Sequence, residues 1–313
     1  MSNQQQQFAH LDAAESAFAQ RELEIVDKQV YETRYPNLQL LDNVPVNTTM
    51  PSWAQAGVYY QWDQFGVAKF IDAYGQGLPR VDVKKTEFTW RAFRAGDAYG
   101  YTLDEIKAAS ALGIPLDASK AKAARRAFEE LLDTTGFSGD TTRGLVGFNA
   151  LSNTVSYTVA NGAAGTATWS TKTPDEIVFD VTDCIGNMIE SSSGVAAPRR
   201  VLLPIRQYNL IASKRMGDGS DVTILKHLLD TQKAVNPGFE IKPWWRLNAA
   251  GSGSADRMIV YRPDPDVVEI YVPEAFNQMP VRQQNLEFVV DCTGKIGSVV
   301  CRAPFEVCYA DGI

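Results

Sequence analysis

The chain has 313 residues and a net charge of −7 at pH 7, with 45% hydrophobic and 21% charged residues. This composition supplies enough apolar side chains for a core, which excludes a disordered protein, and the length allows two domains or one body with extensions. The sequence pI of about 5.0 argues against a general DNA-binding protein, and the absence of a signal-peptide pattern or an apolar run of about 20 residues predicts a soluble protein made inside the cell.

The first 50 residues are expected to form an arm, not a domain. Apolar residues at helical spacing predict an amphipathic helix over residues 8–30. The prolines Pro36, Pro45 and Pro51 then favour an extended chain. Residues 1–45 hold seven acidic and three basic side chains, so this arm carries a net charge of −4.

Two long strands follow the arm. Residues 57–73 alternate in polarity, with Val58, Tyr60 and Trp62 on one side, and residues 81–93 return as a second strand after a turn-rich segment. Because isolated two-stranded hairpins are marginally stable in water, we expect this hairpin to lie against something. Its return strand is basic, since residues 79–94 hold five basic and two acidic side chains, a net charge of +3.

A helix interrupted once is predicted over residues 102–135. Thr102 and Glu105 match a capping box at its start. Gly113 and Pro115 interrupt the helix, and Gly136 is expected to end it.

The second part of this helix has basic residues first and acidic residues last. The helix dipole prefers the reverse order, by a few tenths of a kcal/mol for each charge. Two interpretations stay open: a solvated face with pairs four residues apart, such as Arg126 with Glu130, or a surface that meets a partner. The charges concerned are Lys120, Lys122, Arg125, Arg126, Glu129, Glu130 and Asp133.

The rest of the chain predicts a compact α/β unit followed by strands. Residues 136–172 are rich in Gly, Ser, Thr and Asn, which favours a long loop or short hairpins. Helices and a buried strand then alternate over about 173–250, beginning with Thr173 as N-cap and Pro174 in the first turn. Four β-branched and aromatic runs predict strands near the C-terminus, at 256–263, 266–273, 286–292 and 296–310.

The sequence offers little for catalysis or cofactor binding. Four cysteines without metal-site spacing are expected to be free thiols and not a disulfide framework. Two histidines, His10 and His227, leave almost nothing for a histidine-based triad, and no phosphate loop of the GxxxxGK[ST] type occurs. We therefore predict no catalytic residues, no cofactor and no metal, and a protein that is not an enzyme. The cysteines are Cys184, Cys292, Cys301 and Cys308.

The acidic arm and the basic hairpin suggest assembly. Both segments fold poorly alone and carry opposite charge, so they could clasp each other within or between subunits. Complementary charge of this kind sets register and choice of partner more than raw affinity.

Several stretches, taken in order along the chain, together carry a resemblance to a known family. The stretches are FAHLDAAESAF (8–18), LPRVDVKKTEF (78–88), GDAYGYTLDEIKAA (96–109), LDASKAKAARRAFEE (116–130), TPDEI (173–177), LLPIRQYNLIAS (202–213) and LEFVV…YADGI (286–313). In these stretches the sequence resembles the major capsid proteins of tailed bacteriophages, which have the Hong Kong 97-type fold, and within them a subgroup of short subunits without an N-terminal scaffolding extension. The resemblance covers nearly the whole chain, although no single motif is chemically specific.

The resemblance implies an α+β subunit of four parts. These are an N-terminal arm (1–50), an extended E-loop hairpin (51–101), a P-domain with a long spine helix and a β-sheet (102–139 and 251–313), and an A-domain (140–250). The last β runs are expected to complete the sheet of the P-domain.

The resemblance also implies a function and its partners. The chain would assemble with itself as hexamers and pentamers into the icosahedral head that encloses double-stranded DNA, without specific DNA binding and without a membrane. Further partners would be a portal protein, a separate scaffolding protein and decoration proteins. The subunit would be made in the host cytoplasm and reside in the virion. The candidates for contacts between subunits are Arg80, Asp82, Lys84, Lys85, Arg91, Arg94, Lys122, Arg125, Arg126, Glu129 and Glu130.

Three alternatives stay open on the sequence alone. An encapsulin-like bacterial compartment has the same fold but encloses cargo proteins. A tail-tube or other virion protein would form rings or tubes. A soluble enzyme would be a stable monomer with a ligand pocket.

Overall fold

The structure is a computed structural model that describes residues 35–70, 80–112, 118–217, 219 and 221–313. The chain divides into two compact units, Met1–Asn37 and Leu38–Ile313, and the elements described below all belong to the second. The predicted helix over residues 8–30, the tip of the hairpin and the predicted interruption at Gly113 and Pro115 lie outside the described residues.

The second unit begins with a short helix inside the stretch predicted to be extended. Helix α3 (Leu40–Asn43) forms there because Leu40 is fully buried and its N–H donates to Oδ1 of Asp133, at 2.9 Å. Strand β1 (Val46–Asn47) follows and runs parallel to β8 (Val268–Tyr271). The proline-rich segment is thus held against the body at two points.

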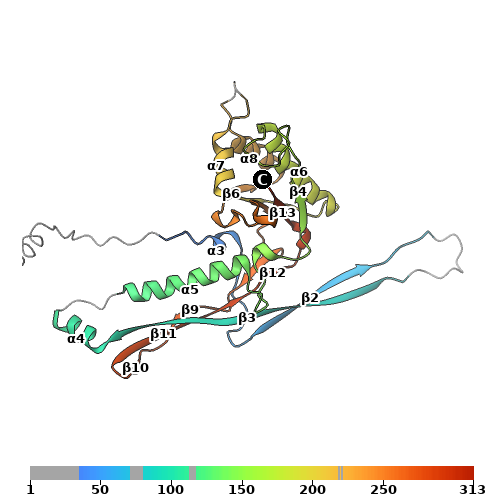
Figure 1. The fold of residues 1–313 in the computed structure, drawn as a ribbon. Coiled ribbons are helices and arrows are strands. Elements are labelled where there is room, and N and C mark those ends of the chain that lie inside the picture. Colours follow the sequence, from blue (N-terminus) through green and yellow to red (C-terminus); the bar gives the residue numbers. More distant parts are fainter. Residues whose placement is uncertain (1–34, 71–79, 113–117, 218, 220) are drawn as a thin grey trace, which may run out of the picture. The chain divides into compact units, whose positions relative to one another are not determined.

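The predicted hairpin is present (Figure 1). Strand β2 (Ala56–Phe65) pairs with the first part of β3 (Asp82–Thr102) in antiparallel register, with Phe65 opposite Asp82. Strand β2 is shorter than predicted and β3 longer, because the second part of β3 pairs with β11 (Glu287–Gly297). The expectation that the hairpin lies against something is therefore confirmed for its base. Strands β9 (Glu274–Gln278) and β10 (Arg282–Gln284) also pair with β11.

Two helices follow β3. Helix α4 (Leu103–Leu112) begins with the predicted capping box, in which Thr102 N–H donates to Oε2 of Glu105 at 2.9 Å and Glu105 N–H donates to Oγ1 of Thr102 at 3.3 Å. Helix α5 (Ser119–Ser138) packs against β3 and β11 with Ala124 and Phe128 buried.

The prediction that Gly136 ends α5 is wrong, since the helix continues to Ser138 and Gly139 follows it with φ 78°. Gly136 serves packing instead. A Cβ atom on Gly136 would lie 2.1 Å from Cδ2 of the buried Leu40 and 2.8 Å from Cδ1 of Ile270. The glycine therefore lets α3 and β8 approach the helix closely.

The α/β unit is built on a five-stranded mixed sheet. Helix α6 (Pro174–Ser191) has the predicted cap, because Thr173 and Glu176 form a complete capping box. The helices α7 (Ile205–Ser213) and α8 (Ile224–Val235) also confirm the predictions for this region. The sheet has the order β4–β13–β7–β5–β6, with the strands β4 (Val155–Thr158), β5 (Arg200–Leu203), β6 (Glu240–Pro243), β7 (Arg257–Tyr261) and β13 (Val307–Asp311).

The C-terminal runs are strands, as predicted, but they are divided among three sheets. Strand β11 joins the hairpin, and β8 lies between β1 and β12 (Val299–Cys301). In contrast to the expectation that the last runs complete one sheet, β7 and β13 pair with the strands of the α/β unit. Short 3₁₀ helices occur at Phe148–Ala150, Trp245–Leu247, Ser252–Ser254 and Pro304–Glu306.

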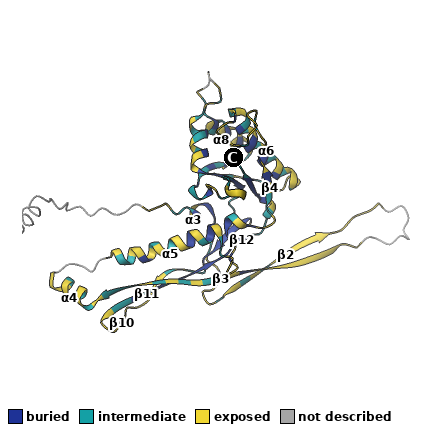
Figure 2. Cartoon of the chain, in the orientation of Figure 1, coloured by how far each residue is buried: buried dark blue, intermediate teal, exposed yellow. Residues whose placement is uncertain are grey.

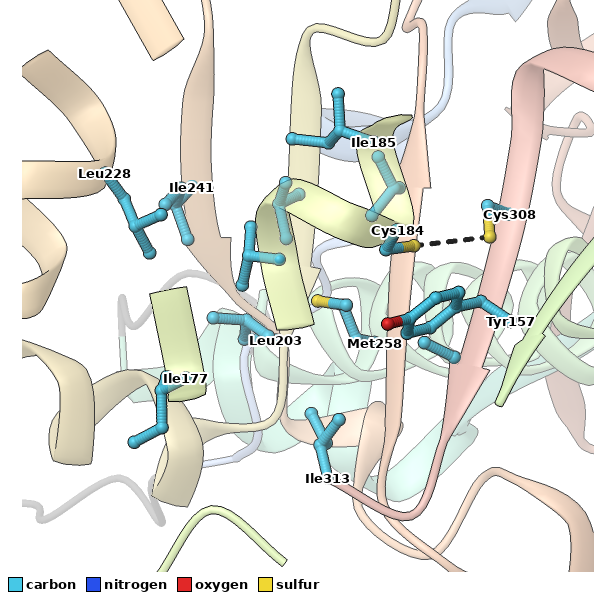
Figure 3. Close-up of a cluster of buried hydrophobic side chains, with 14 of the residues drawn as sticks. Tyr157, Ile177, Cys184, Ile185, Leu203, Leu228, Ile241, Met258, Cys308 and Ile313 are labelled. Carbon is cyan, nitrogen blue, oxygen red and sulfur yellow. Dashed lines mark hydrogen bonds between the residues drawn. The ribbon is translucent and has the colours of Figure 1, made fainter. Parts of the chain in front are cut away.

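The main apolar core of the α/β unit lies between its sheet and α6, α7 and α8 (Figure 3). The four cysteines are free, as predicted, and three of them are buried. The same unit also buries an ion pair that the sequence reasoning missed. Nζ of Lys172 lies 2.6 Å from Oδ2 of Asp180, and the two side chains are 1% and 2% exposed.

Candidate inter-subunit interface

The distal part of the hairpin has no covering element among the described residues. Figure 2 shows β2 beyond Tyr59 and the first part of β3 exposed. The register places Tyr60 opposite Glu87 and Trp62 opposite Lys85, so these aromatic and charged side chains share one face. Tyr60 is 51% exposed and Trp62 is 66% exposed. We call the four residues Val58, Tyr60, Trp62 and Val83 the aromatic face of the hairpin.

A cation lies on this aromatic face. Nζ of Lys85 is 3.6 Å from the centroid of the Tyr60 ring and 5.8 Å from that of Trp62. An exposed cation–π contact of this type contributes about 0.5–1 kcal/mol. The face therefore presents two aromatic rings with a positive charge between them, a composition that suits a protein interface.

The base of the hairpin is fixed to the body by a tightly packed indole. The Trp90 ring stacks on Tyr271, with centroids 3.7 Å apart. Gly57 and Gly297 make room for it, since a Cβ on Gly57 would lie 2.3 Å from Cζ2 of Trp90 and a Cβ on Gly297 would lie 3.3 Å from Cζ3. The hairpin is thus anchored at one end and uncovered at the other.

The face of the hairpin that carries Trp90, opposite the aromatic face, borders a hollow of about 430 Å³. Tyr59 stacks on Phe88 there, with centroids 5.1 Å apart, and the Arg302 guanidinium lies 5.7 Å from the Tyr59 centroid. Burial raises the pKa of Tyr59 above its ordinary value, although the Arg302 charge acts in the opposite direction. Arg302 is itself held by the buried Glu269, so the base of the hairpin rests on an ordered polar network.

The predicted contact residues of the hairpin lie just before β3 (Arg80), on the uncovered part of β3 (Asp82, Lys84 and Lys85), and farther along it at the base (Arg91 and Arg94). Arg94 is already paired with Glu274, at 2.9 Å. The Asp82 carboxylate accepts from the N–H of Val83, at 2.8 Å, and so stabilises the start of β3. The exposed members of this set are Arg80, Asp82, Lys84, Lys85, Arg91 and Arg94.

The predicted contact residues on α5 form a second set. A pair four residues apart forms here between Arg125 and Glu129, at 2.8 Å. Lys120 turns to Glu105 of α4, at 3.1 Å, and therefore ties the two helices together. Lys122, Arg125 and Glu130 are exposed, whereas Arg126 and Glu129 are half-buried.

The sequence reasoning found the charges of the hairpin but missed the role of its aromatic side chains. The alternation of Val58, Tyr60 and Trp62 placed them correctly on one side of a strand. A stripe of this kind normally indicates a face turned to the core. One signal in the sequence could have indicated that this stripe is exposed. No third strand or helix is predicted in this part of the sequence that could cover it.

The described residues contain no helix that is long and apolar enough to span a bilayer. Within the same ranges, no group of three or more His, Cys, Asp or Glu side chains is placed to hold a metal ion.

A long hairpin paired with a C-terminal strand, a spine helix across that sheet and an α/β unit define the Hong Kong 97-type shell fold. The family model described as "Major capsid protein" matches residues 66–313, and the chain belongs to this family of capsid shell proteins. The match begins just after β2 and covers β3 and every later element.

Solved structures show the same fold at low sequence identity. The capsid of Myoviridae phage XM1 has 17% identity and a TM-score of 0.78, with 94% of this chain and 98% of that chain covered. The capsid of a native GTA particle has 10% identity and a TM-score of 0.61, with 96% and 99% covered. A chain of Mycobacterium phage Ogopogo has 10% identity and a TM-score of 0.60, with 94% and 98% covered. No curated protein sequence matches the chain.

Proposed function

We propose that this capsid protein assembles with itself, as hexamers and pentamers, into the icosahedral head that encloses the double-stranded DNA of a tailed bacteriophage. The observation that carries the proposal is the hairpin, which is anchored by Trp90 at its base and exposes the aromatic face beyond it. Several aromatic side chains on an uncovered two-stranded ribbon are costly in an isolated subunit. A second copy of the chain is the partner that relieves this cost.

The parts of the subunit follow from this proposal. Residues 1–50 would be the N-terminal arm, 51–101 the E-loop, and α5 with β9, β10 and β11 the P-domain. The α/β unit would be the A-domain around the capsomer axes. Because β7 and β13 pair with β5 and β4, we assign them to the A-domain and not to the P-domain.

The proposed role is structural, and we propose no catalytic step. The partners beyond the subunit itself would be a portal protein, a separate scaffolding protein and decoration proteins. The subunit would be made in the host cytoplasm and packed into the virion. Its net charge of −7 supports a wall that encloses DNA without gripping it.

The full chain, expressed alone and separated by size, is expected to form closed shells or rings of five and six subunits in negative-stain electron microscopy. A chain that remains monomeric even after a scaffolding protein is added would contradict the proposal. Shells that copurify with an enzyme cargo would support an encapsulin-like compartment instead, and tubes would support a tail protein.

The charge of the hairpin is expected to contribute to the contact between subunits. The double variant Lys84→Glu and Lys85→Glu should raise the protein concentration needed for assembly, and more strongly at about 50 mM than at about 500 mM salt, because salt screens exposed charges. Light scattering over a concentration series measures this shift. Trp62→Ser should also weaken assembly, but about equally at both salt concentrations, since it removes apolar contact.

A matched control distinguishes an effect of the hairpin charges from an effect of the net charge of the protein. Lys226→Glu with Lys233→Glu makes the same change of charge at exposed positions of α8 and should shift assembly less. If both double variants assemble like the wild type at every salt concentration, the hairpin charges play no part in the contact.

A further inference from the structure

Two of the four cysteines meet inside the α/β unit. Cys184 lies on α6 and Cys308 on β13, 124 positions apart in the sequence, and their Sγ atoms are 3.3 Å apart (Figure 3). Both side chains are fully buried. The pair therefore joins the helical layer of this unit to the second strand of its sheet.

The surroundings keep the Cys184 thiol protonated. Contact with Cys308, together with burial, raises the pKa of the Cys184 thiol well above its ordinary value. Met258 and Ile185 belong to the same apolar cluster. Because a buried thiol reacts slowly, we expect any oxidation of this pair to be slow.

The other two cysteines differ from this pair. All four cysteines lie in the described part of the chain, and among them Cys184 and Cys308 have their sulfur atoms in contact. Cys301 is half-buried, and burial raises its pKa to about 12. Cys292 is buried beside Val290, and burial raises its pKa as well. These two thiols serve as internal controls.

We propose that Cys184 and Cys308 form a two-thiol oxidation site that takes a peroxide and closes to a disulfide. One sulfur attacks hydrogen peroxide, the O–O bond breaks, and a sulfenic acid and one water form. The second sulfur then attacks the sulfenic sulfur, the S–O bond breaks, and the S–S bond forms with release of a second water. Two S–H hydrogens leave in the two waters, so the protein loses two electrons and the peroxide gains them.

The geometry favours closure over further oxidation. A disulfide needs a separation of about 2.05 Å between the sulfur atoms, so the pair must approach by little more than an ångström. Because the partner sulfur is already in contact, a sulfenic acid at either position is trapped before it is oxidised further. The bond would link α6 to β13 and close a loop that contains β5 and β7. This inference does not depend on the proposed function.

The test uses the full chain, treated with hydrogen peroxide, quenched, unfolded and alkylated at its remaining thiols. Trypsin without reductant should then give peptide 173–199 joined to peptide 303–313, with a mass about 2 Da below the sum of the two. The number of alkylated thiols should fall from the four of the sequence to about two. Since the bond closes a long loop, the oxidised protein should also melt at a temperature higher by about 5 °C or more.

Cys301→Ser should leave the joined peptide unchanged, whereas Cys184→Ala should abolish it. If Cys184→Ala does not fold, the peptide map of the wild type decides alone. Oxidation of Cys301 to sulfinic acid without the joined peptide would overturn the proposal, and so would a link that involves Cys292 or Cys301.

Discussion

Gly147→Ala is expected to lower the free energy of unfolding by about 3 kcal/mol, because it forces backbone atoms apart. A Cβ on Gly147 would lie 2.2 Å from the nitrogen of Gly139, 2.5 Å from the carbonyl oxygen of Phe137 and 2.5 Å from the carbonyl carbon of Ser138. A crowded side chain can rotate away, but these atoms form the end of α5. Gly139 is fixed there by its N–H, which donates to the carbonyl of Thr135 at 2.8 Å.

The segment that contains Gly147 also connects α5 to β12, near the base of the hairpin. The N–H of Val299 donates to the carbonyl of Val146 at 2.9 Å, and Val146 N–H donates to Oγ of Ser298 at 3.3 Å. A shift of Gly147 is therefore expected to reach β12 and to lower the yield of assembled shells as well as stability.

Thermal unfolding measures this effect, and a melting temperature lower by about 6–12 °C is expected for a body of this size. Gly186→Ala is the matched control, because Gly186 lies inside α6 and the added Cβ would meet no atom within 4 Å apart from its chain neighbours and the backbone of its own helix. Alanine should be neutral or stabilising by up to about 1 kcal/mol at that position. Equal melting temperatures for Gly147→Ala and the wild type would contradict the prediction, because they would show that the loop around Gly147 can move without loss of stability.

Local signals in the sequence predicted the elements well. The capping boxes at Thr102 and Thr173 and the alternation of β2 each involve neighbours within a few residues, and the structure confirms them. Gly136 was misassigned as a helix stop because its reason lies in Leu40, 96 positions earlier, and in Ile270. A close approach between distant segments leaves no local pattern.

The same limit applies to the sheets and to the candidate interface. The strands β7 and β13 were recognised as strands, but their partners β5 and β4 depend on chain crossings that propensity does not encode. The net charge of residues 79–94 identified the hairpin as basic. The exposure of Tyr60 and Trp62 could not be predicted in this way, because it depends on whether other elements pack over them. The positions of the exposed aromatic rings thus required the tertiary structure.

Lys172→Met is expected to lower the free energy of unfolding by about 3–5 kcal/mol, because it leaves a buried carboxylate without its counter-ion. Nζ of Lys172 also donates to the carbonyl of Ala160 at 2.6 Å, and Nε1 of Trp169 donates to Asp180 at 2.9 Å. The ammonium group thus joins α6 to the loop before it, and the indole alone cannot balance the charge of Asp180. Urea unfolding measures the loss.

The loss in Lys172→Met should depend on pH in a defined direction. Burial raises the pKa of Asp180 above its ordinary value even with Lys172 present, and removal of the ammonium raises this pKa further. A carboxyl group with a raised pKa in the folded state favours folding where it is protonated, and this contribution is lost as the pH rises through that pKa. The difference in stability between variant and wild type should therefore be smaller at about pH 5 than at about pH 7.

Two further variants separate charge from shape. Lys242→Met breaks a half-exposed pair with Glu240, at 3.1 Å, and should cost no more than about 1 kcal/mol. The double variant Lys172→Met with Asp180→Leu removes both buried charges and should recover much of the stability lost in Lys172→Met. If the double variant is less stable than Lys172→Met, the hydrogen bonds to Trp169 and Ala160 stabilise this part of α6 more than the balance of charge does.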